Sequence, residues 1–266
     1  MTVDYGNLPF EEAEKFFRDK VRIPTRRWDD LKHGMHARGF MIAGAQRDDM
    51  LCDFQTAIKK AIEQGTTLQE FRNDFNVIVN RYGWSYNGGQ GWRTRVIYDT
   101  NLRTSYMAGR YKQMTDPDVL AYRPYWMYRH NACTHPRPQH VAWNGLVLRH
   151  DDDFWSSHFP PNGWGCHCDV EPQSKRDMDR MGKTGPDQAP PLVIDPKTGE
   201  PAGIGKGWGY NVGEAAWGKQ LSQKVMDDWK AQGSRAWQRI TPGNWREADR
   251  PERLPVDMPK ARPGSG

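Results

Sequence analysis

The chain has 266 residues, a formal net charge of +5 and 36% hydrophobic residues. This length is sufficient for one or two domains with a hydrophobic core. No apolar stretch approaches the roughly 20 residues of a membrane-spanning helix, and residues 1–10 lack the basic-then-apolar pattern of a secretory signal, so we expect neither.

The sequence is rich in tryptophan, with 12 residues of this type, so large aromatic side chains must build much of the core. The small basic excess fits contact with nucleic acid or with an acidic protein surface, and it equally fits an ordinary globular protein. The four cysteines are Cys52, Cys133, Cys166 and Cys168. The last two are too close in sequence to form a good disulfide with each other, so we expect a reducing compartment with free or metal-bound thiols.

Residues 9–82 have a helical pattern. Over 47–64, apolar side chains recur every three or four residues: Leu51, Phe54, Ile58 and Ile62. This spacing predicts an amphipathic helix that Gly65 ends. Thr67 and Glu70 have the spacing of a capping box at the start of a second helix, so we expect a helical hairpin.

A long helix is predicted over Trp92–Met114, after a loop at 84–91. Its middle carries small and polar residues on neighbouring faces: Asn101, Thr104, Ser105, Ala108 and Gly109. These residues permit close packing of another helix. Alternatively Arg103 and Arg110, with Arg93 and Arg95, contact phosphates or a partner. We favour packing, because charged residues on a helix usually form solvated surface.

The second half has strand-like segments at Tyr122–Arg129, Gly145–Arg149 and Cys168–Glu171. A helical half followed by a stranded half predicts an α+β fold with a long central helix, a small sheet and an extended Pro/Gly-rich arm. A last helix is indicated by Trp217, Leu221, Val225 and Trp229. We expect the following units: 1–118, helical; 119–182, a small α+β core with a Cys/His loop; 183–240, the arm and a helix; 241–266, an extended tail.

Residues 130–168 contain most of the candidate metal ligands. In an extended segment, residues two apart point to the same side, so Cys166 and Cys168 could reach one ion, as could Cys133 and His135. Tetrahedral zinc needs four such ligands, although these spacings are tighter than usual. The alternative is that the cysteines are small buried apolar residues.

The same region offers two other interpretations. Histidines together with Asp151–Asp153 could serve a nuclease or hydrolase, but the sequence lacks a metalloprotease helix motif, a phosphate-binding glycine loop and a nucleophile elbow. The three aspartates are more simply a turn or cap before Phe154. The segment Pro160–Cys166 alternates rigid and permissive residues around Trp164, which predicts a tight turn leading into the Cys-x-Cys strand. We therefore expect no enzyme.

Several segments occur in the order typical of one family: Tyr98–Arg103 leading to Ala108–Arg110, Arg123–Trp126, Arg137–His140 with Gly145, Asp153–Trp155, Pro160–Cys168 and later Gly207–Gly213. With them the sequence resembles the head-morphogenesis proteins of tailed phages related to the F protein of phage Mu, the MuF family. Within this pattern we single out a structural motif: Asp153, Trp155, Pro160, Pro161, Gly163 and Trp164.

The resemblance implies a minor structural protein of the phage head that acts in head assembly and DNA packaging at the portal vertex. Its expected partners are the portal protein and other head proteins, in some relatives also DNA, and no membrane. Its expected location is the virion, and the host cytoplasm during assembly. The arm at 183–213 and the tail after Thr241 are the candidate contact segments.

The resemblance also bears on the metal. Some relatives from phages of Gram-positive hosts have a Cys-x-x-Cys pair at the positions of Arg137 and His140, and a histidine at that of Gly163. This chain departs from both but keeps one histidine and two cysteines, which leaves four candidate ligands for a structural zinc: Cys133, His140, Cys166 and Cys168. The alternative function is a nucleic-acid-binding or metal-dependent nuclease-like protein that uses the His/Asp/Cys cluster.

Overall fold

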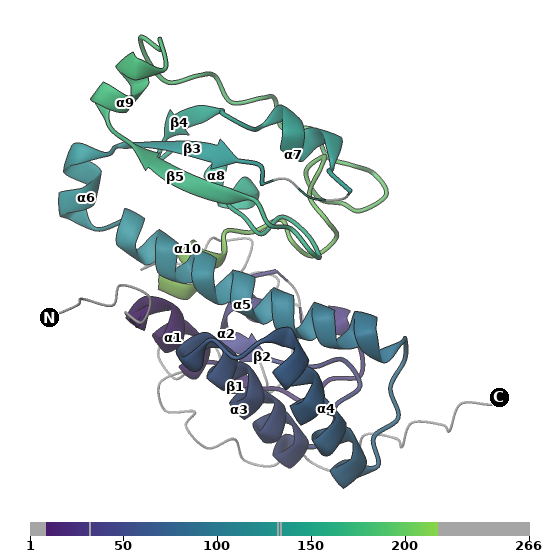
Figure 1. Ribbon diagram of the computed structural model, residues 1–266. Helices are drawn as coiled ribbons and strands as arrows, with labels where there is room; N and C mark the ends of the chain where they lie inside the picture. The colour runs from purple at the N-terminus through teal and green to yellow at the C-terminus, as the bar shows by residue number, and fades with distance from the viewer. Residues whose placement is uncertain (1–8, 32, 132, 134, 218–266) are drawn as a thin grey trace, which may run out of the picture.

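A computed structural model describes residues 9–217 except 32, 132 and 134. The predicted α+β fold is confirmed. A long helix, α5 (Gln90–Met114), runs between a helical layer and a small antiparallel sheet (Figure 1). Among the described helices, none is both long and apolar enough to cross a membrane.

The helical layer contains α1 (Glu11–Arg18), α3 (Asp48–Gln64) and α4 (Leu68–Tyr82). The predicted hairpin of α3 and α4 is confirmed together with its stop and start signals. Gly65 ends α3 in the left-handed region at φ +69°. The Thr67 backbone N–H donates to Glu70 Oε2 at 2.6 Å, and the Thr67 hydroxyl accepts from the Glu70 backbone N–H.

The prediction of helix throughout 9–82 is wrong between α1 and α3. Four short elements occupy this segment: β1 (Val21–Arg22), η2 (Trp28–Asp30), α2 (Met35–Arg38) and β2 (Gly39–Phe40). The two strands pair in parallel, and the Ile23 N–H donates to the Phe40 carbonyl at 2.9 Å. This pairing joins residues that are not neighbours in sequence, so tertiary packing overrides the local helix propensity.

The sheet has the order β4-β3-β5, and the three predicted strands form it. The strands are β3 (Tyr125–Arg129), β4 (Val147–Arg149) and β5 (Asp169–Gln173), and both pairings are antiparallel. Trp126 of β3 packs edge-to-face on Trp155 at 5.6 Å and on Tyr111 of α5 at 5.8 Å. The connections hold four short helices that the sequence analysis did not predict: α6 (Pro117–Tyr122), α7 (Pro138–Ala142), α8 (Trp155–His158) and α9 (Lys175–Arg180).

The Pro/Gly-rich arm divides into an exposed part and a buried part. Most residues of 183–199 are exposed or half-buried. From Glu200 onward the chain enters the core through Ile204, Trp208 and Tyr210, and then forms α10 (Val212–Trp217) against α5. Three residues of the predicted last helix, Leu221, Val225 and Trp229, and the tail 241–266 lie outside the described residues.

Close packing along the middle of α5, the interpretation that we favoured, is confirmed. A Cβ on Gly109 would lie 2.7 Å from Phe10 Cζ and 2.9 Å from the backbone N of Ala13, so α1 contacts the backbone of α5 directly. At a second contact, Gly213 of α10 fits against the ring of Tyr111. The Trp217 indole N–H then donates to the Ala108 carbonyl at 2.8 Å.

We expect Gly109→Ala to destabilise the protein by about 1–3 kcal/mol, because its new methyl group would overlap the backbone of α1. Gly91→Ala in the same helix is the matched control, since a Cβ there meets no atom within 4 Å. Replacing a helical glycine by alanine in open space should stabilise by up to about 1 kcal/mol. Chemical denaturation measures both variants, and equal stabilities would contradict the close contact.

Candidate metal centre

The segment 160–168 forms a loop that precedes β5 and is buried except at Trp164, Gly165 and His167. The Pro160–Pro161 peptide bond is cis, and both prolines are buried. Asn162 is fully buried and holds the loop at two points. Its side-chain Oδ1 accepts from the Tyr128 hydroxyl at 2.9 Å, and its backbone carbonyl accepts from the Gly205 N–H at 2.9 Å. The loop is thereby attached to β3 and to the arm.

Three buried side chains from α7 and the loop place their ligand atoms within 4.8 Å of one another: His140, Cys166 and Cys168. The Nδ1 atom of His140 lies 3.4 Å from Cys168 Sγ and 3.8 Å from Cys166 Sγ. Ligands of a tetrahedral zinc ion are separated by roughly 3.4–3.8 Å, given bonds of about 2.3 Å to sulfur and 2.0–2.1 Å to nitrogen. These three residues, termed the metal group below, therefore have the residue types and the spacing of a zinc site.

The orientation of His140 also suits a metal. Its Nε2 lies 2.9 Å from the Gly203 carbonyl, which can only accept, so Nε2 carries the proton and Nδ1 directs its lone pair toward the sulfurs. Gly203 adopts φ +93°, and a Cβ there would lie 2.6 Å from Cβ of Gln139 on α7. This close approach of the arm to α7 positions the Gly203 carbonyl. The His140 imidazole also stacks on Trp143, with 5.2 Å between ring centroids.

The two thiols differ in acidity. The hydrogen bond from Cys168, supported by His140, lowers the pKa of Cys166. The same hydrogen bond, together with burial, raises the pKa of Cys168. The pair therefore gives up one proton readily and retains the second. A cation bound to both sulfurs would displace that second proton, because thiolates are the ligands of zinc.

The structure does not bring Cys133 into this group. The Cys133 side chain is exposed. His130 contacts one of the three ligands, with its Nδ1 atom 3.5 Å from Cys168 Sγ, but it is not part of the set whose ligand atoms all lie within 4.8 Å of one another. The sequence analysis did not single out His130, although the pairing of β3 with β5 places this residue opposite Cys168. Arg129 pairs with Asp169 between β3 and β5, so the residues just beyond this pair, His130 and Cys168, must face each other.

The residues of the predicted structural motif occupy different environments. Trp155 is buried, and its indole N–H donates to the Arg149 carbonyl at 2.8 Å. Asp153 is exposed. Gly163 is buried against the guanidinium of Arg137, which donates to the Trp164 carbonyl at 2.7 Å. The half-exposed Trp164 ring makes edge-to-face contacts with two other indoles, those of Trp28 and Trp208.

Three of the four arginines singled out for phosphate contact bind other parts of the protein. Arg103 donates to the Cys168 carbonyl at 2.6 Å. Arg93 donates to the Ala43 carbonyl and lies over the ring of Trp84, and Arg110 donates to a glutamine side chain of the same helix. Arg95 is exposed. In the structure, Arg93, Arg103 and Arg110 thus have intramolecular roles.

The aspartates before Phe154 form a turn, as the simpler interpretation predicted. Asp151 pairs with Arg149 at 2.8 Å, and Asp152 Oδ1 accepts from the Phe154 N–H at 2.9 Å. His158 stacks on Phe154, and burial lowers its pKa to about 4, so this imidazole is neutral at pH 7. Within the described part of the chain, no carboxylate belongs to the metal group of His140, Cys166 and Cys168.

We expect Arg103→Met to lower stability by about 1–3 kcal/mol, since the Cys168 carbonyl loses a charge-assisted hydrogen bond next to the metal group. Arg95→Met, at an exposed position of the same helix, is the control and should change stability by less than about 0.5 kcal/mol. Urea denaturation compares the two. An Arg103→Met protein of normal stability with weakened DNA binding would instead assign Arg103 to phosphate contact.

Comparisons with known proteins agree with the family resemblance. Residues 52–171 match the model of the family described as "Phage Mu protein F like protein". The putative capsid assembly protein F of Escherichia phage Mu is 31% identical over 259 residues, which cover 84% of this chain and 58% of that protein. The Mu-like prophage FluMu F protein of Haemophilus influenzae is 32% identical over 230 residues, 74% of this chain and 55% of that protein.

The chain thus spans somewhat more than half the length of these relatives. No solved structure matches it. The family match covers most of α3, all of α4 and α5 and most of the sheet, and both relatives align well beyond it. On these grounds the chain belongs to the Phage Mu F-like family.

Proposed function

We propose that this chain is a minor structural protein of a phage head that acts in head assembly and DNA packaging at the portal vertex. It works by binding the portal protein or other head proteins and catalyses no reaction. It is part of the virion and is assembled in the host cytoplasm. The names of the relatives, a capsid assembly protein and a Mu-like F protein, support this assignment.

The observation that carries the binding role is an exposed apolar segment on the arm. Leu192, Val193 and Ile194 are 69%, 57% and 51% exposed. The segment is nevertheless held in place, because the Ala202 N–H donates to the Val193 carbonyl at 2.7 Å and Ile194 forms a β-bridge with Pro201. Adjacent exposed apolar side chains mark interaction sites, and a segment that is already ordered loses little entropy on binding.

The nucleic-acid alternative has less support. Three of its four arginines are engaged within the protein, and the His140 group has thiol and imidazole ligands, whereas metal-dependent nucleases commonly use carboxylates. DNA remains a candidate partner through exposed basic residues such as Arg95. Such binding would weaken steeply with salt.

We also propose a structural zinc ion held by His130, His140, Cys166 and Cys168. The contacts of Cys168 Sγ with both imidazoles support this set, and binding would draw the His130 imidazole toward the other three ligands, whose atoms already lie within 4.8 Å of one another. Bound there, zinc would supply a cross-link between β3, α7 and the loop before β5. Four protein ligands leave no coordination position for a substrate, which agrees with a role in binding.

Replacing Leu192, Val193 and Ile194 together by serine should leave thermal stability nearly unchanged, because these side chains are outside the core. The amount of the protein in purified heads should fall severalfold, since an exposed apolar contact is lost. Co-expression with the head proteins of its phage and quantitative gel analysis of gradient-purified heads measure this. Val77→Ser on α4, at an equally exposed valine, is the matched control. Normal incorporation of the triple variant would overturn the assignment of this segment.

Protein purified without chelator should contain about one zinc ion per chain, as a structural site is fully occupied. Cys166→Ser and His130→Asn should lower the zinc content, whereas Cys133→Ser should retain it because that thiol is exposed. Metal analysis by mass spectrometry gives the stoichiometry. Zinc-free wild-type protein would refute the site, and loss of zinc in Cys133→Ser would restore Cys133 to the ligand set.

A further inference from the structure

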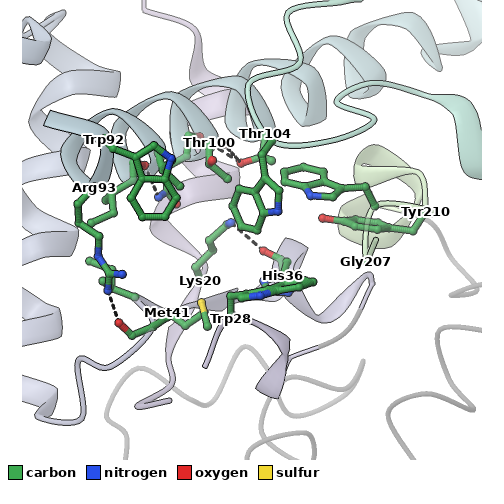
Figure 2. A pocket seen from close by; sticks show the side chains of 18 residues that line it. Lys20, Trp28, His36, Met41, Trp92, Arg93, Thr100, Thr104, Gly207 and Tyr210 are labelled. Atoms are coloured by element: carbon green, nitrogen blue, oxygen red, sulfur yellow. Dashed lines mark hydrogen bonds between the residues drawn. The ribbon is translucent and has the colours of Figure 1, made fainter. Parts of the chain in front are cut away.

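A cavity of about 450 Å³ lies beside α5, and its lining includes none of the proposed zinc ligands but four tryptophans: Trp28, Trp92, Trp164 and Trp208. We term it the indole cavity. Figure 2 shows its walls, which come from the segment between α1 and α3, from α5, from the loop before β5 and from the arm. Trp92 is 61% exposed, and Trp164 is half-exposed, so the cavity opens to solvent between aromatic rings. Its volume is in the range of pockets that bind a small molecule or one or two large side chains.

The charged groups that line the indole cavity are cationic. Lys20 and Arg93 are among the lining residues, and none of the lining residues is an aspartate or glutamate. In Figure 2 the Lys20 side chain extends from the floor toward the α5 wall, with Trp92 on one side and Tyr210 on the other. His36 also lines the cavity and is neutral at pH 7, because burial lowers its pKa to about 4. Burial lowers the pKa of Lys20 to about 7, so about half of this side chain is protonated at neutral pH, and an anionic ligand would favour the protonated form. The lining thus combines a hydrophobic surface with groups that can offer positive charge to an anion.

Lys20 is buried without a carboxylate partner in the cavity. Its side chain donates to the His36 carbonyl at 2.8 Å and lies 4.7 Å from the ring centroid of Phe16. An ammonium group has three donors, so this carbonyl leaves donor capacity for a ligand. Arg93 also lines the cavity, and within the described chain its buried Nε has no hydrogen-bond partner. Buried cations are usually paired, so the cavity favours an anionic group in its occupant.

The α5 wall offers little for reading a nucleobase. The Thr104 hydroxyl donates to the Thr100 carbonyl at 2.8 Å, and the Asn101 amide donates to the Ile97 carbonyl at 2.8 Å. These groups are used within the helix, whereas a buried base would need partners for several polar atoms on its edge. A hydrophobic side chain has no such requirement. The hydrogen-bonding groups of this wall therefore favour an apolar side chain of a protein over a nucleobase.

We propose that the indole cavity binds a segment of a partner protein that inserts an aromatic side chain among the tryptophans and places an adjacent carboxylate beside Lys20. The chemistry of the occupant follows from the lining alone. That the partner is a head protein rests on the proposed function. The cavity is separate from the exposed Leu192–Ile194 segment, so the two contacts can be tested independently.

Two blocked tripeptides serve as probes: acetyl-Asp-Trp-Asp-amide and its uncharged analogue acetyl-Asn-Trp-Asn-amide. Isothermal titration calorimetry with the full chain should show binding of the acidic peptide about tenfold tighter than that of the analogue, the ratio expected for a hydrogen bond to a charged group. Lys20→Met should abolish this preference while the analogue binds as before. Equal affinities of the two peptides for wild-type protein, or a preference that survives Lys20→Met, would overturn the proposal.

A second variant tests the cavity itself. Thr100→Phe, at a lining position of α5, should fill the space and weaken both peptides at least tenfold. Arg95→Met, at an exposed position of the same helix, is the control and should bind like wild type. Circular dichroism verifies the fold of every variant. Lys20→Met removes the desolvation that lowers the pKa of Lys20 to about 7 and also the hydrogen bond to the His36 carbonyl, and because these two effects oppose each other the variant should fold with a thermal stability close to that of wild type.

A ten-nucleotide oligothymidylate tests whether the indole cavity binds nucleic acid instead of a protein segment. The proposal predicts that it does not displace the acidic peptide from wild-type protein. Displacement from wild-type protein, together with direct binding of the oligonucleotide that is lost in Thr100→Phe, would overturn the proposal in favour of nucleic acid. Because these measurements use the isolated chain, they stand apart from incorporation into heads: peptide binding without incorporation would contradict the proposed function alone.

Discussion

The fold depends on the contacts that α5 makes along its middle. A helix that is covered on more than one face can be approached closely only where its own residues, or those of its neighbours, are small. Gly109 admits α1 to the backbone of α5, and Gly213 of α10 fits against Tyr111. The Trp217 indole then binds the carbonyl of Ala108, one residue before the first of these contacts. The arm, although distant in sequence, is thereby joined to the N-terminal helices through α5.

The same helix positions both candidate binding features. Arg103 reaches the carbonyl of Cys168 and so connects α5 to the metal group. Thr100 and Thr104, within one turn of it, line the indole cavity. The Thr104 hydroxyl donates to the Thr100 carbonyl within the helix, as is usual for threonine, which leaves its methyl group available to an apolar wall. Small and polar residues in the middle of α5 therefore serve packing on some faces and the cavity on another.

Sequence reasoning succeeded where the decisive interaction is local. The capping residues Thr67 and Glu70 and the left-handed Gly65 act within a few residues of themselves, so their pattern predicts the α3–α4 hairpin. It failed between α1 and α3, where β1 and β2 pair across the chain. It also missed the buried half of the arm. There, frequent glycines suggest an irregular segment, yet the aromatic anchors Trp208 and Tyr210 hold the chain in the core.

The metal group could be predicted in part for the same reason. Cys166 and Cys168 are linked by their spacing, and His140 followed from the family pattern. His130 depends on the register between β3 and β5, which no local pattern contains. For Arg93, Arg103 and Arg110, helical spacing gives the relative direction of the side chains. Helical spacing does not show which face of α5 another segment covers. Here the covering segments supply carbonyl partners for Arg93 and Arg103.

The loop before β5 connects the metal group to the indole cavity. Its two cysteines face His140, while Trp164, two residues before Cys166, turns toward Trp28 and Trp208 at the cavity. A metal ion that requires this loop conformation stabilises it by mass action, and so does an occupant that requires the position of Trp164. Such coupling is reciprocal, so if both proposed ligands bind, each would raise the affinity of the other by the same factor. The cysteines would then contribute to binding at a distance, by fixing the position of a tryptophan in the cavity wall.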